Sequence, residues 1–404
     1  MKKNILNDIA IVINDRIESN KITLSQYVDT DSMLPNKNGK TLPVTLPSNV
    51  SLYKFKKNDI LISNIRPYLK KIWLASYNGG CSTDILVFRA KDKDLFHYLF
   101  ALLLQDSFYS YNMLATKGVK MPRGIVSHIL KFPIPHININ HKINIGLFIL
   151  NIDNLLSINK NINYELEQLS KTLYNYWFVQ FDFPDKNGRP YKSSGGKMVW
   201  NEDLKKEIPE GWEVKNFINN NILTLISSGV EYFTKKNYLA TKNINNELIS
   251  DGVWISYDNR ETRANMQPQQ NSIWFAKMQK SIKHITLPNN SKWFMDKYIL
   301  STGFFGVKCI YEAFSYIHCF INSNYFENKK DSLSHGAVQK AINSNDLESI
   351  LFVIPPLHLL KKFNDKVYSL LEMKLNIIKT NQELTSLRDF LLPLLMNGQA
   401  VIKE

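Results

Sequence analysis

The segments NYELEQLSKTL (163–173) and NQELTSLRDFL (381–391) share an asparagine that is followed by leucine three, six and ten residues later. Three further pairs of short motifs match in the same order and at nearly the same separation: Ser82 with Ser301, Gly118 with Gly336, and Pro135 with Pro355. Ordered matches at one separation indicate an internal duplication, whereas a single match arises by chance. The sequence therefore predicts two copies of one domain type.

Each copy ends in a long amphipathic segment, over about residues 142–181 in the first and 357–392 in the second. The recurring apolar positions of the first are Leu155, Ile158, Ile162, Leu166, Leu169, Leu173 and Tyr176. Those of the second are Leu360, Phe363, Val367, Leu371, Leu375, Ile378, Leu384, Leu387 and Leu391, and Pro393 with Asn397-Gly398 is expected to end this helix. One such stripe usually packs onto its own domain core. Two at equivalent places favour antiparallel helices packed along both stripes, as a rod with a globular domain at each end.

Short β-branched or aromatic runs between turn residues predict strands at 59–63, 72–75, 85–88, 253–257, 272–276 and 303–307. The expected fold class is α+β, with two strand-rich domains separated by two long antiparallel helices and related by a pseudo-twofold internal repeat. The expected boundaries are 1–135 for the first domain, 136–183 for the first helix, 184–355 for a linker and the second domain, and 356–404 for the second helix. The polar, glycine-rich stretch 184–197 is the expected linker.

The composition favours a polyanionic partner. The 404 residues include 50 Lys and Arg against 36 Asp and Glu, a net charge of +14, and each neutralised phosphate strengthens binding by counterion release. A general basic bias without such a partner is the alternative. Three scattered cysteines argue against a disulfide framework or a zinc site. The start of the sequence lacks the pattern of a signal peptide and no run of about 18 apolar residues occurs, so we expect a soluble, cytoplasmic protein.

Catalytic motifs are not found in the sequence. Gly195-Gly196-Lys197 lacks the spacing of a phosphate-binding loop, and Asp185 with Asp203-Leu-Lys205 only superficially resembles the carboxylates of a metal nuclease. We therefore expect no catalytic residue and no metal site, and a binding function. The alternatives are a stand-alone site-specific DNA nuclease or methyltransferase and a general nucleic-acid coat or RNA-binding protein. Two unlike domains on a fixed spacer argue against the coat protein.

Basic residues that alternate with aromatic or glycine residues indicate a nucleic-acid surface, although each alone is more often a solvated surface. In the first half the predicted DNA-binding residues are Arg66, Lys70, Lys71, Lys117, Lys120 and Arg123, of which the last three lie in a glycine-bracketed loop suited to phosphates. In the second half they are Arg260, Arg263, Asn265, Gln267, His335, Gln339 and Lys340. The stretch 260–267 offers side chains that pair with guanine and adenine edges, and 334–340 is the counterpart of the first basic loop.

The residues at the junctions between domains and helices resemble a known family. Residues 173–184, 188–196 and 208–212 are similar to the central conserved region of type I restriction specificity subunits, and 387–399 to their distal conserved region. Prolines 133 and 135, and 355 and 356, resemble the exits of the family's target recognition domains. Residues 79–89, 264–267 and 275–278, which include Lys277, resemble strands of those domains. The chain departs from the family where the first half lacks the Pro-x-Gly-Trp sequence that occurs at 209–212.

This resemblance implies that two recognition domains each read half of a split site in double-stranded DNA, while two antiparallel helices hold them apart. It implies two methyltransferase subunits docked on the helices, with restriction (translocase–nuclease) subunits added to these. Tyr174, Trp177 and Phe178 in the central region, and Arg388 and Asp389 in the distal region, become the expected partner-binding residues. No cofactor is expected for this chain, whereas the partner subunits are expected to use S-adenosylmethionine, ATP and Mg.

Overall fold

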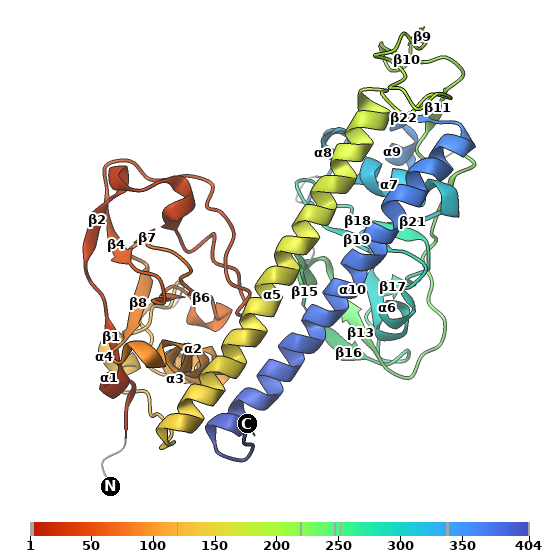
Figure 1. Cartoon of the computed structure of the whole chain (residues 1–404). Helices are drawn as coiled ribbons and strands as arrows, with labels where there is room; N and C mark the ends of the chain where they lie inside the picture. The colour runs from red at the N-terminus through yellow and green to blue at the C-terminus, as the bar shows by residue number, and fades with distance from the viewer. Residues whose placement is uncertain are drawn as a thin grey trace. The chain divides into compact units, whose positions relative to one another are not determined.

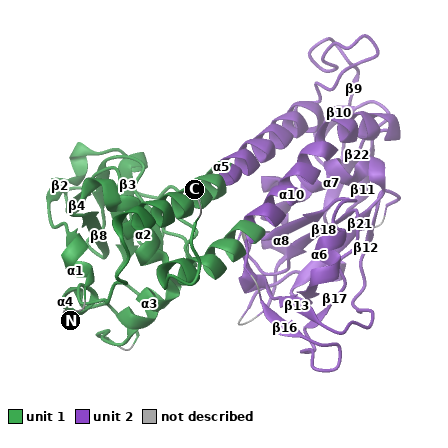
Figure 2. Cartoon of the chain, turned by 60° about the horizontal axis from the view of Figure 1, so that its bottom comes forward, with its two compact units in different colours: residues 1–158, 383–404 green, residues 159–382 purple. Residues whose placement is uncertain are grey.

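The computed structural model describes residues 4–118, 120–218, 220–245, 248–250, 252–336 and 339–402. The chain divides into two compact units, which Figure 2 distinguishes by colour: unit 1 contains residues 1–158 and 383–404, and unit 2 contains residues 159–382. Two long helices, α5 (Ile139–Tyr174) and α10 (Leu357–Met396), contribute residues to both units (Figure 1). No helix in this described part of the chain is long and apolar enough to cross a bilayer.

Unit 1 is built on two four-stranded sheets. One has the order β1 (Ala10–Val12), β8 (Ile85–Ala90), β5 (Ile60–Ser63) and β6 (Ile72–Leu74), all antiparallel. The other has the order β2 (Arg16–Glu18), β4 (Ser51–Phe55), β7 (Gly79–Cys81) and β3 (Tyr27–Val28). Its short helices include α1 (Leu6–Ile9), α2 (Phe96–Leu104), α3 (Asp106–Met113) and α4 (Val126–Ile129). Because α2 is almost wholly apolar, all but its first residue is buried in the core of the unit.

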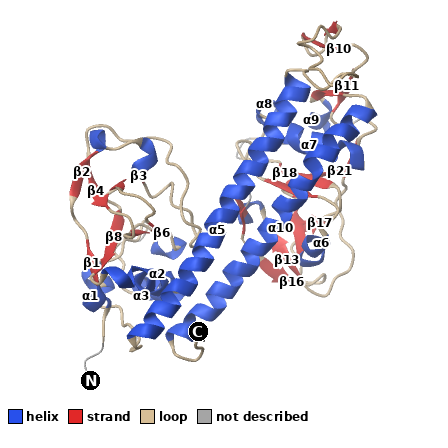
Figure 3. Ribbon diagram, viewed as in Figure 1, coloured by secondary structure: helices blue, strands red, loops and turns tan. Residues whose placement is uncertain are grey.

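Unit 2 also contains two four-stranded sheets, and its strands are drawn in red in Figure 3. One has the order β12 (Leu223–Leu225), β21 (Phe304–Cys309), β18 (Ser272–Ala276) and β19 (His284–Leu287). The other has the order β16 (Val253–Ile255), β13 (Lys236–Leu239), β20 (Tyr298–Ser301) and β17 (Ala264–Met266). Smaller pairs join β9 (Met198–Asn201) to β10 (Lys206–Pro209), β11 (Glu213–Asn216) to β22 (Leu351–Ile354), and β14 (Ile244–Asn245) to β15 (Leu248–Ile249). Its helices include α6 (Lys292–Lys297), α7 (Phe314–Ile321), α8 (Asn324–Leu333) and α9 (Ser344–Glu348).

The pairing pattern of the two units confirms the internal duplication. In unit 1 the parallel pair of β3 and β7 places Val28 opposite Cys81, and in unit 2 β13 and β20 place Leu239 opposite Leu300. The helices α2 and α3 follow β8 as α7 and α8 follow β21. The six predicted strands are confirmed as β5, β6, β8, β16, β18 and β21.

The end of α10 differs from the prediction. Pro393 lies inside the helix, which continues to Met396, so the expected stop at Pro393 is wrong. A proline in the last turn removes one backbone hydrogen bond, and the burial of Leu395 and Met396 in the core of unit 1 offsets that loss. The helix ends where Gly398 adopts a φ of 70° and donates its N–H to the carbonyl of Leu395.

The apolar stripe predicted to be buried is buried over part of α10 but exposed on α5. The predicted stripe of α10 is confirmed between Leu360 and Leu375, where these two residues and Phe363, Val367 and Leu371 are all buried. It is wrong at Leu387, which is 45% exposed. The predicted packing stripe of α5 is wrong, because Leu155, Ile158, Ile162, Leu169 and Tyr176 are between 38 and 54% exposed. The face of α5 that is buried in their place carries the apolar residues Ile145, Ile149 and Ile152 and then the polar residues Asn163 and Ser170.

Polar pairs occupy the contact between α5 and α10 within unit 2. Asn159 donates from Nδ2 to Oδ1 of Asn381 at 2.7 Å, and Lys374 forms an ion pair with Glu167. Residue numbers rise along one helix as they fall along the other, so the helices are antiparallel, as predicted. Burying polar side chains is unfavourable unless each finds a partner, and the sequence pattern of one helix contains no information on the partners supplied by the other.

The stretch 184–197, expected as a linker, is folded against the core of unit 2. The ring of Phe183 stacks on Tyr191 at 4.6 Å between centroids and on Trp212 at 5.1 Å. The carboxylate of Asp182 accepts hydrogen bonds from the backbone N–H of Ser193 at 2.7 Å and from its hydroxyl at 2.6 Å. The polar composition predicted a linker, whereas the aromatic residues Phe183, Tyr191 and Trp212 anchor this stretch to the core.

Candidate nucleic-acid interface

The basic loop of unit 1 is closed by its own backbone. Lys117 and Arg123 exchange two N–H to carbonyl hydrogen bonds of 2.9 Å, which form a small antiparallel bridge. Gly118 has a φ of 88°, a conformation that favours glycine, and a Cβ there would lie 3.2 Å from the carbonyl oxygen of Met121. The side chains of Lys117, Lys120 and Arg123 are exposed on this closed loop. Val119 lies outside the described residues.

A short turn brings a second cation to the same loop. The 3-10 turn Pro67–Leu69 is flanked by Arg66 and Lys70, which both adopt left-handed backbone conformations. The backbone N–H of Arg66 donates to the carbonyl of Pro122 at 2.8 Å, so the turn is joined to the loop. The structure therefore brings together the predicted residues Arg66, Lys117, Lys120 and Arg123.

Carboxylates of unit 1 neutralise part of this basic surface. Arg123 forms an ion pair of 2.9 Å with Asp84, and Lys70 forms one of 2.8 Å with Asp106. Lys71 donates from Nζ to the carbonyl of Thr30 at 2.5 Å, and burial lowers the pKa of this lysine. Three predicted cations of unit 1 are exposed and form no ion pair with a described residue: Arg66, Lys117 and Lys120.

The equivalent loop of unit 2 has the same closure. His335 and Ala341 exchange backbone hydrogen bonds of 3.1 and 3.0 Å, and the N–H of Gln279 donates to the carbonyl of Lys340 at 3.0 Å. A Cβ on Gly336 would lie 2.5 Å from the carbonyl oxygen of Gln339, so glycine is needed here too. The side chains of His335, Gln339 and Lys340 are exposed, whereas Ala337 and Val338 lie outside the described residues. The two loops are therefore counterparts, as the sequence predicted.

The residues predicted to contact bases have different surroundings. The guanidinium of Arg260 stacks on Tyr257 at 3.8 Å and donates to the carbonyl of the same residue at 2.6 Å. Asn265 and Gln267 are half-buried, and the Oε1 atom of Gln267 has no hydrogen-bond partner among the described residues. Arg263 is exposed. Of this group, Arg263 is the side chain best placed to reach a ligand in solvent.

The turn Thr302–Gly303 connects Arg263 to the basic loop. The carbonyl of Arg263 accepts the N–H of Thr302 at 2.8 Å, and the N–H of Lys277 donates to the carbonyl of Gly303 at 3.0 Å. The backbone carbonyl of Lys277 also accepts the N–H of Ile342, just after the loop, at 3.0 Å. The ammonium of Lys277 lies over the ring of Phe305 at 4.1 Å, and burial lowers its pKa. Arg263, Lys277 and the loop 335–341 thus form one surface.

Two lysines of this surface were missed from the sequence. Lys242 is exposed in the short 3-10 turn Thr241–Asn243, and Lys283 donates from Nζ to the carbonyl of Thr241 at 2.6 Å. Lys283 repeats the contact that Lys71 makes in unit 1, but the two lysines are 212 residues apart and not about 218, so the offset of the sequence motifs does not identify Lys283. We call the segments 241–243, 277–279, 302–303 and 335–341 the recognition edge of unit 2. The equivalent segments 30–32, 64–66, 83–84 and 117–123 form the recognition edge of unit 1.

The predicted partner-binding residues are mostly internal. Tyr174, Trp177, Phe178 and Arg388 are buried, with Arg388 only 1% exposed. Trp177 and Phe178 pack against Phe363 of α10 at 5.5 and 4.9 Å between ring centroids. Asp389 is partly exposed and accepts hydrogen bonds from Lys37 at 3.2 Å and Arg388 at 3.0 Å. Only Asp389 of this set therefore presents much surface to a partner.

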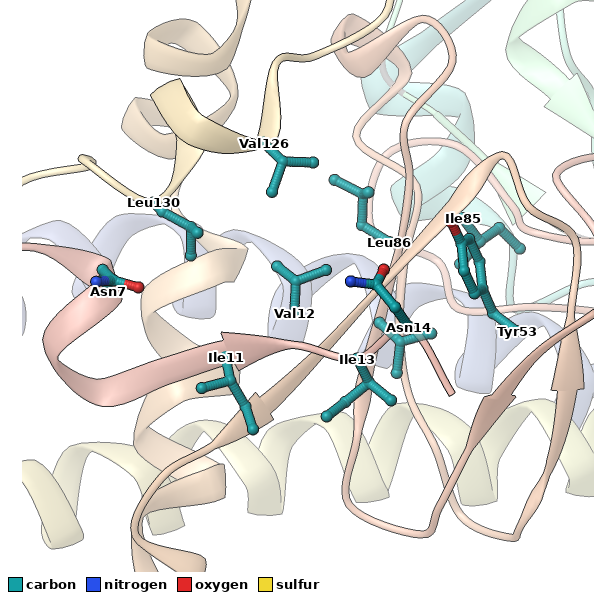
Figure 4. A pocket seen from close by; sticks show the side chains of 11 residues that line it. Asn7, Ile11, Val12, Ile13, Asn14, Tyr53, Ile85, Leu86, Val126 and Leu130 are labelled. Atoms are coloured by element: carbon teal, nitrogen blue, oxygen red, sulfur yellow. The ribbon is translucent and has the colours of Figure 1, made fainter. Parts of the chain in front are cut away.

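Two other features offer no catalytic arrangement. A hollow between β1 and α4 in unit 1 is lined by apolar residues such as Val12, Leu86 and Leu130, with Asn7 and Asn14 at its polar positions (Figure 4). The carboxylate of Asp185 accepts the backbone N–H groups of Asn187 and Arg189, so it closes a turn. Within the described ranges no cluster of three His, Cys, Asp or Glu side chains suits a metal ion.

Comparison with known proteins shows which family the chain resembles. The sequence profile described as "Type I restriction modification DNA specificity domain" matches residues 5–168. The chain is 25% identical over 324 residues to the type I restriction enzyme MjaIX specificity subunit of Methanocaldococcus jannaschii, covering 78% of this chain and 71% of that protein. It is 29% identical over 83 residues to the EcoDI specificity subunit of Escherichia coli, which covers 20% of this chain and 18% of that protein.

A solved structure has the same fold over almost the whole chain. The S subunit of a type I restriction–modification system from M. genitalium superposes with a TM-score of 0.56 at 14% identity, and the match covers 98% of this chain and 95% of that one. This likeness supports the two-fold repeated architecture, including the second half of the chain, which lies beyond the matched profile.

Proposed function

Since the chain belongs to the specificity subunits of type I restriction–modification systems, we propose that it reads a split site in double-stranded DNA and holds the other subunits of its complex together. Specificity subunits are the non-catalytic, DNA-recognising members of these complexes. In this proposal each recognition edge contacts one half-site, and the bases between the half-sites are unspecified. Neither a stand-alone nuclease nor a methyltransferase is favoured.

One observation carries the proposal: a loop with the same backbone closure and a glycine at its second residue recurs in both units with different side chains. The loop of unit 1 presents Lys117, Lys120 and Arg123, whereas that of unit 2 presents His335 and Lys340. A repeated backbone with unlike side chains suits two docking events on unlike sequences, since backbone geometry positions the loop at phosphates while side chains read base edges. The two half-sites should therefore differ.

The exposed stripe of α5 is the surface that we assign to the methyltransferase subunits. Within unit 2 it contains Ile162 and Leu169, which are 38 and 48% exposed, together with Tyr176 and Val179. Apolar residues aligned on one helix face are typical of a protein interface. Tyr174, Trp177 and Phe178 then support this surface from inside, because they hold α5 against α10.

The finer assignments follow from the same proposal. Two methyltransferase subunits and the restriction subunits complete the complex, and these partners supply the S-adenosylmethionine, ATP and Mg chemistry. The chain is organised as recognition domains at 1–135 and 184–355 with helices at 136–183 and 356–404. A cytoplasmic location suits a DNA partner and the three free cysteines, all of which are buried.

Methylome sequencing tests this function. We expect cells that express the chain with its partner methyltransferase to carry one methylated, interrupted motif whose two halves differ. Cells that express either protein alone should lack it, because the chain supplies recognition and the partner supplies chemistry. Methylation or cleavage by the purified chain, or a motif that is independent of the chain, would contradict the proposal.

A further inference from the structure

The two recognition edges are held by equivalent contacts, so they can be compared position by position. The ammonium of Lys71 binds the carbonyl of Thr30 at 2.5 Å in unit 1, and that of Lys283 binds the carbonyl of Thr241 at 2.6 Å in unit 2. These contacts join the same two segments in each unit. Each residue of one edge therefore has a counterpart in the other.

The loops and turns match in the same way. The N–H of Asn64 donates to the carbonyl of Asp84 at 2.8 Å, as the N–H of Lys277 donates to the carbonyl of Gly303 at 3.0 Å. The pairing of Arg66 with Pro122 is repeated by Gln279 with Lys340, and the bridge of Lys117 with Arg123 by His335 with Ala341. The alignment therefore rests on four backbone or side-chain contacts that the units share.

This alignment shows that the two edges differ in charge. Unit 2 has Lys242 where unit 1 has Asp31, and Gly303 where unit 1 has Asp84. It also has Lys277 where unit 1 has the neutral Asn64. Unit 1 has cations of its own at Arg66, Lys117, Lys120 and Arg123, where unit 2 has Gln279, His335, Val338 and Ala341. These four cations share their edge with Asp31 and Asp84, and Asp84 pairs with Arg123.

The carboxylates of unit 1 act on its own cations. Asp84 forms an ion pair with Arg123, and Asp31 and Asp29 attract the ammonium of Lys71. In unit 2, burial alone lowers the pKa of Lys283, with no carboxylate acting on it. Among the described residues, no carboxylate forms an ion pair with the lysines of this edge, Lys242, Lys277 and Lys340, or with Arg263 beside it.

We propose that the recognition edge of unit 2 is the stronger electrostatic anchor of this chain on the phosphates of duplex DNA, whereas the edge of unit 1, where Asp31 and Asp84 offset part of the positive charge, adds sequence preference with a smaller salt-dependent affinity. The inference rests on the proposed function and assigns unequal roles to the two units. Lys242 and Lys277 supply anchor charges that unit 1 lacks at both equivalent positions. The carboxylates of Asp31 and Asp84 repel phosphate but can accept hydrogen bonds from the amino groups of cytosine or adenine.

The test is the salt dependence of DNA binding by the full chain in complex with its methyltransferase subunits. Binding to a duplex with the methylated motif is measured between about 50 and 200 mM salt, and the logarithm of the association constant is plotted against the logarithm of salt concentration. Because each lost phosphate contact reduces that slope by about 0.9, Lys242→Ala and Lys277→Ala should each flatten it by up to that amount. Asp31→Lys, which places the residue of unit 2 in unit 1, should steepen the slope by a similar amount.

The control is Lys292→Ala, which removes an exposed lysine on α6 that pairs with Asp296 outside the recognition edge; it should leave the slope unchanged. Thermal unfolding of each variant shows that the fold is intact, and Lys242, as an exposed turn residue, is the variant least able to disturb it. If the wild type binds its motif specifically but the slope is unchanged in both unit 2 variants, the anchor proposal is wrong. The same holds if Asp31→Lys leaves the slope unchanged. Loss of all preference for the motif in the wild type would instead refute the proposed function.

Discussion

Arg260 and Arg263 are three residues apart, yet they have different prospects of contacting DNA. The guanidinium of Arg260 is held by the ring and carbonyl of Tyr257, whereas Arg263 is exposed beside the turn Thr302–Gly303. We expect Arg263→Ala to relax sequence preference at the half-site of unit 2 by about 1–3 kcal/mol for a lost bidentate base contact. Arg260→Ala should have a much smaller effect.

The measurement is competition binding with duplexes in which each base pair of that half-site is substituted in turn. The matched pair of arginine variants makes the experiment internally controlled, since both remove one positive charge from the same strand-loop segment. Equal losses for the two variants would mean that Arg260 leaves Tyr257 when DNA binds.

At the scale of single residues, the sequence could predict where a cation lies but not what it contacts. Lys117 and Arg123 were identifiable because a loop with the same glycine recurs in the second half. The ion pair of Arg123 with Asp84 was not, because 39 residues separate them and only the fold brings them together. Lys242 was missed since an isolated lysine in a short turn has no pattern that distinguishes it from ordinary surface.

Among the helices, the contact of α5 with α10 and α7 has a buried charged network whose energy depends on pH. Burial raises the pKa of Glu167, but His318 at 3.6 Å and the ammonium of Lys374 outweigh this and hold it well below its usual range. A depressed carboxyl pKa stabilises the fold at a pH above the usual value, about 4.3, and this contribution is lost as the pH falls toward the folded value. The unfolding free energy should therefore decrease in acid.

We expect Glu167→Gln to lower the unfolding free energy at pH 7 by about 3–5 kcal/mol, because it leaves Lys374 buried without its counter-charge. The variant should also lose the part of the acid dependence that Glu167 causes, which denaturant titrations between about pH 3 and 7 can measure. The double replacement Glu167→Leu with Lys374→Leu is the control and should be far milder, since it removes both charges. A severe loss in the double variant would indicate that packing, and not charge, dominates this contact.

The exposed stripe of α5 gives a prediction about assembly. Ile162→Arg and Leu169→Arg place a charge on the stripe within unit 2 and should prevent the methyltransferase from co-eluting with the chain in size-exclusion chromatography. Their thermal unfolding should stay within about 0.5 kcal/mol of the wild type, as is usual for surface substitutions. Tyr164→Arg, at an exposed position on another face of the same helix, is the matched control. Co-elution that survives both stripe variants would show that the partner docks elsewhere.

At the scale of the helices, the hydrophobic period of the sequence identified both α5 and α10. It assigned the wrong face of α5 to the interior. Its apolar positions form a regular stripe, and regular stripes usually face a core. The interior face carries Asn159 and Glu167, whose partners Asn381 and Lys374 are supplied by a segment more than 200 residues away. The hydrophobic period is a property of one helix sequence. Which face of that helix is buried depends also on the side chains that the second helix brings against it.

At the scale of the whole molecule, the long helices should set the spacing of the DNA site. α5 has 36 residues and α10 has 40, and each contributes to both units. Insertion of four residues, about one turn or 6 Å, into both helices adds that length to each connection. We expect the unspecified gap of the methylated motif to grow by one or two base pairs, at about 3.4 Å per pair, while both half-sites stay unchanged.

Methylome sequencing of cells that express the lengthened chain measures this change. A four-residue substitution cassette of the same composition, without added length, is the control and should preserve the original motif. An unchanged gap with the lengthened chain would refute the idea that helix length sets the spacing of the DNA site. Altered half-sites would mean that the insertion disturbs the recognition domains.

The ion pair of Glu167 with Lys374 also bears on the ancestry of the chain. Advancing or receding by the repeat distance of 218 residues leads from Lys374 to Leu156 and from Glu167 to Thr385, so neither half carries both members of the pair. If the first half met a second copy of itself in the same antiparallel manner, a buried glutamate would face leucine, and a charge without a counter-charge is strongly disfavoured. Two copies of the first half would therefore lack this ion pair, and we expect them to associate more weakly than the first half does with the second.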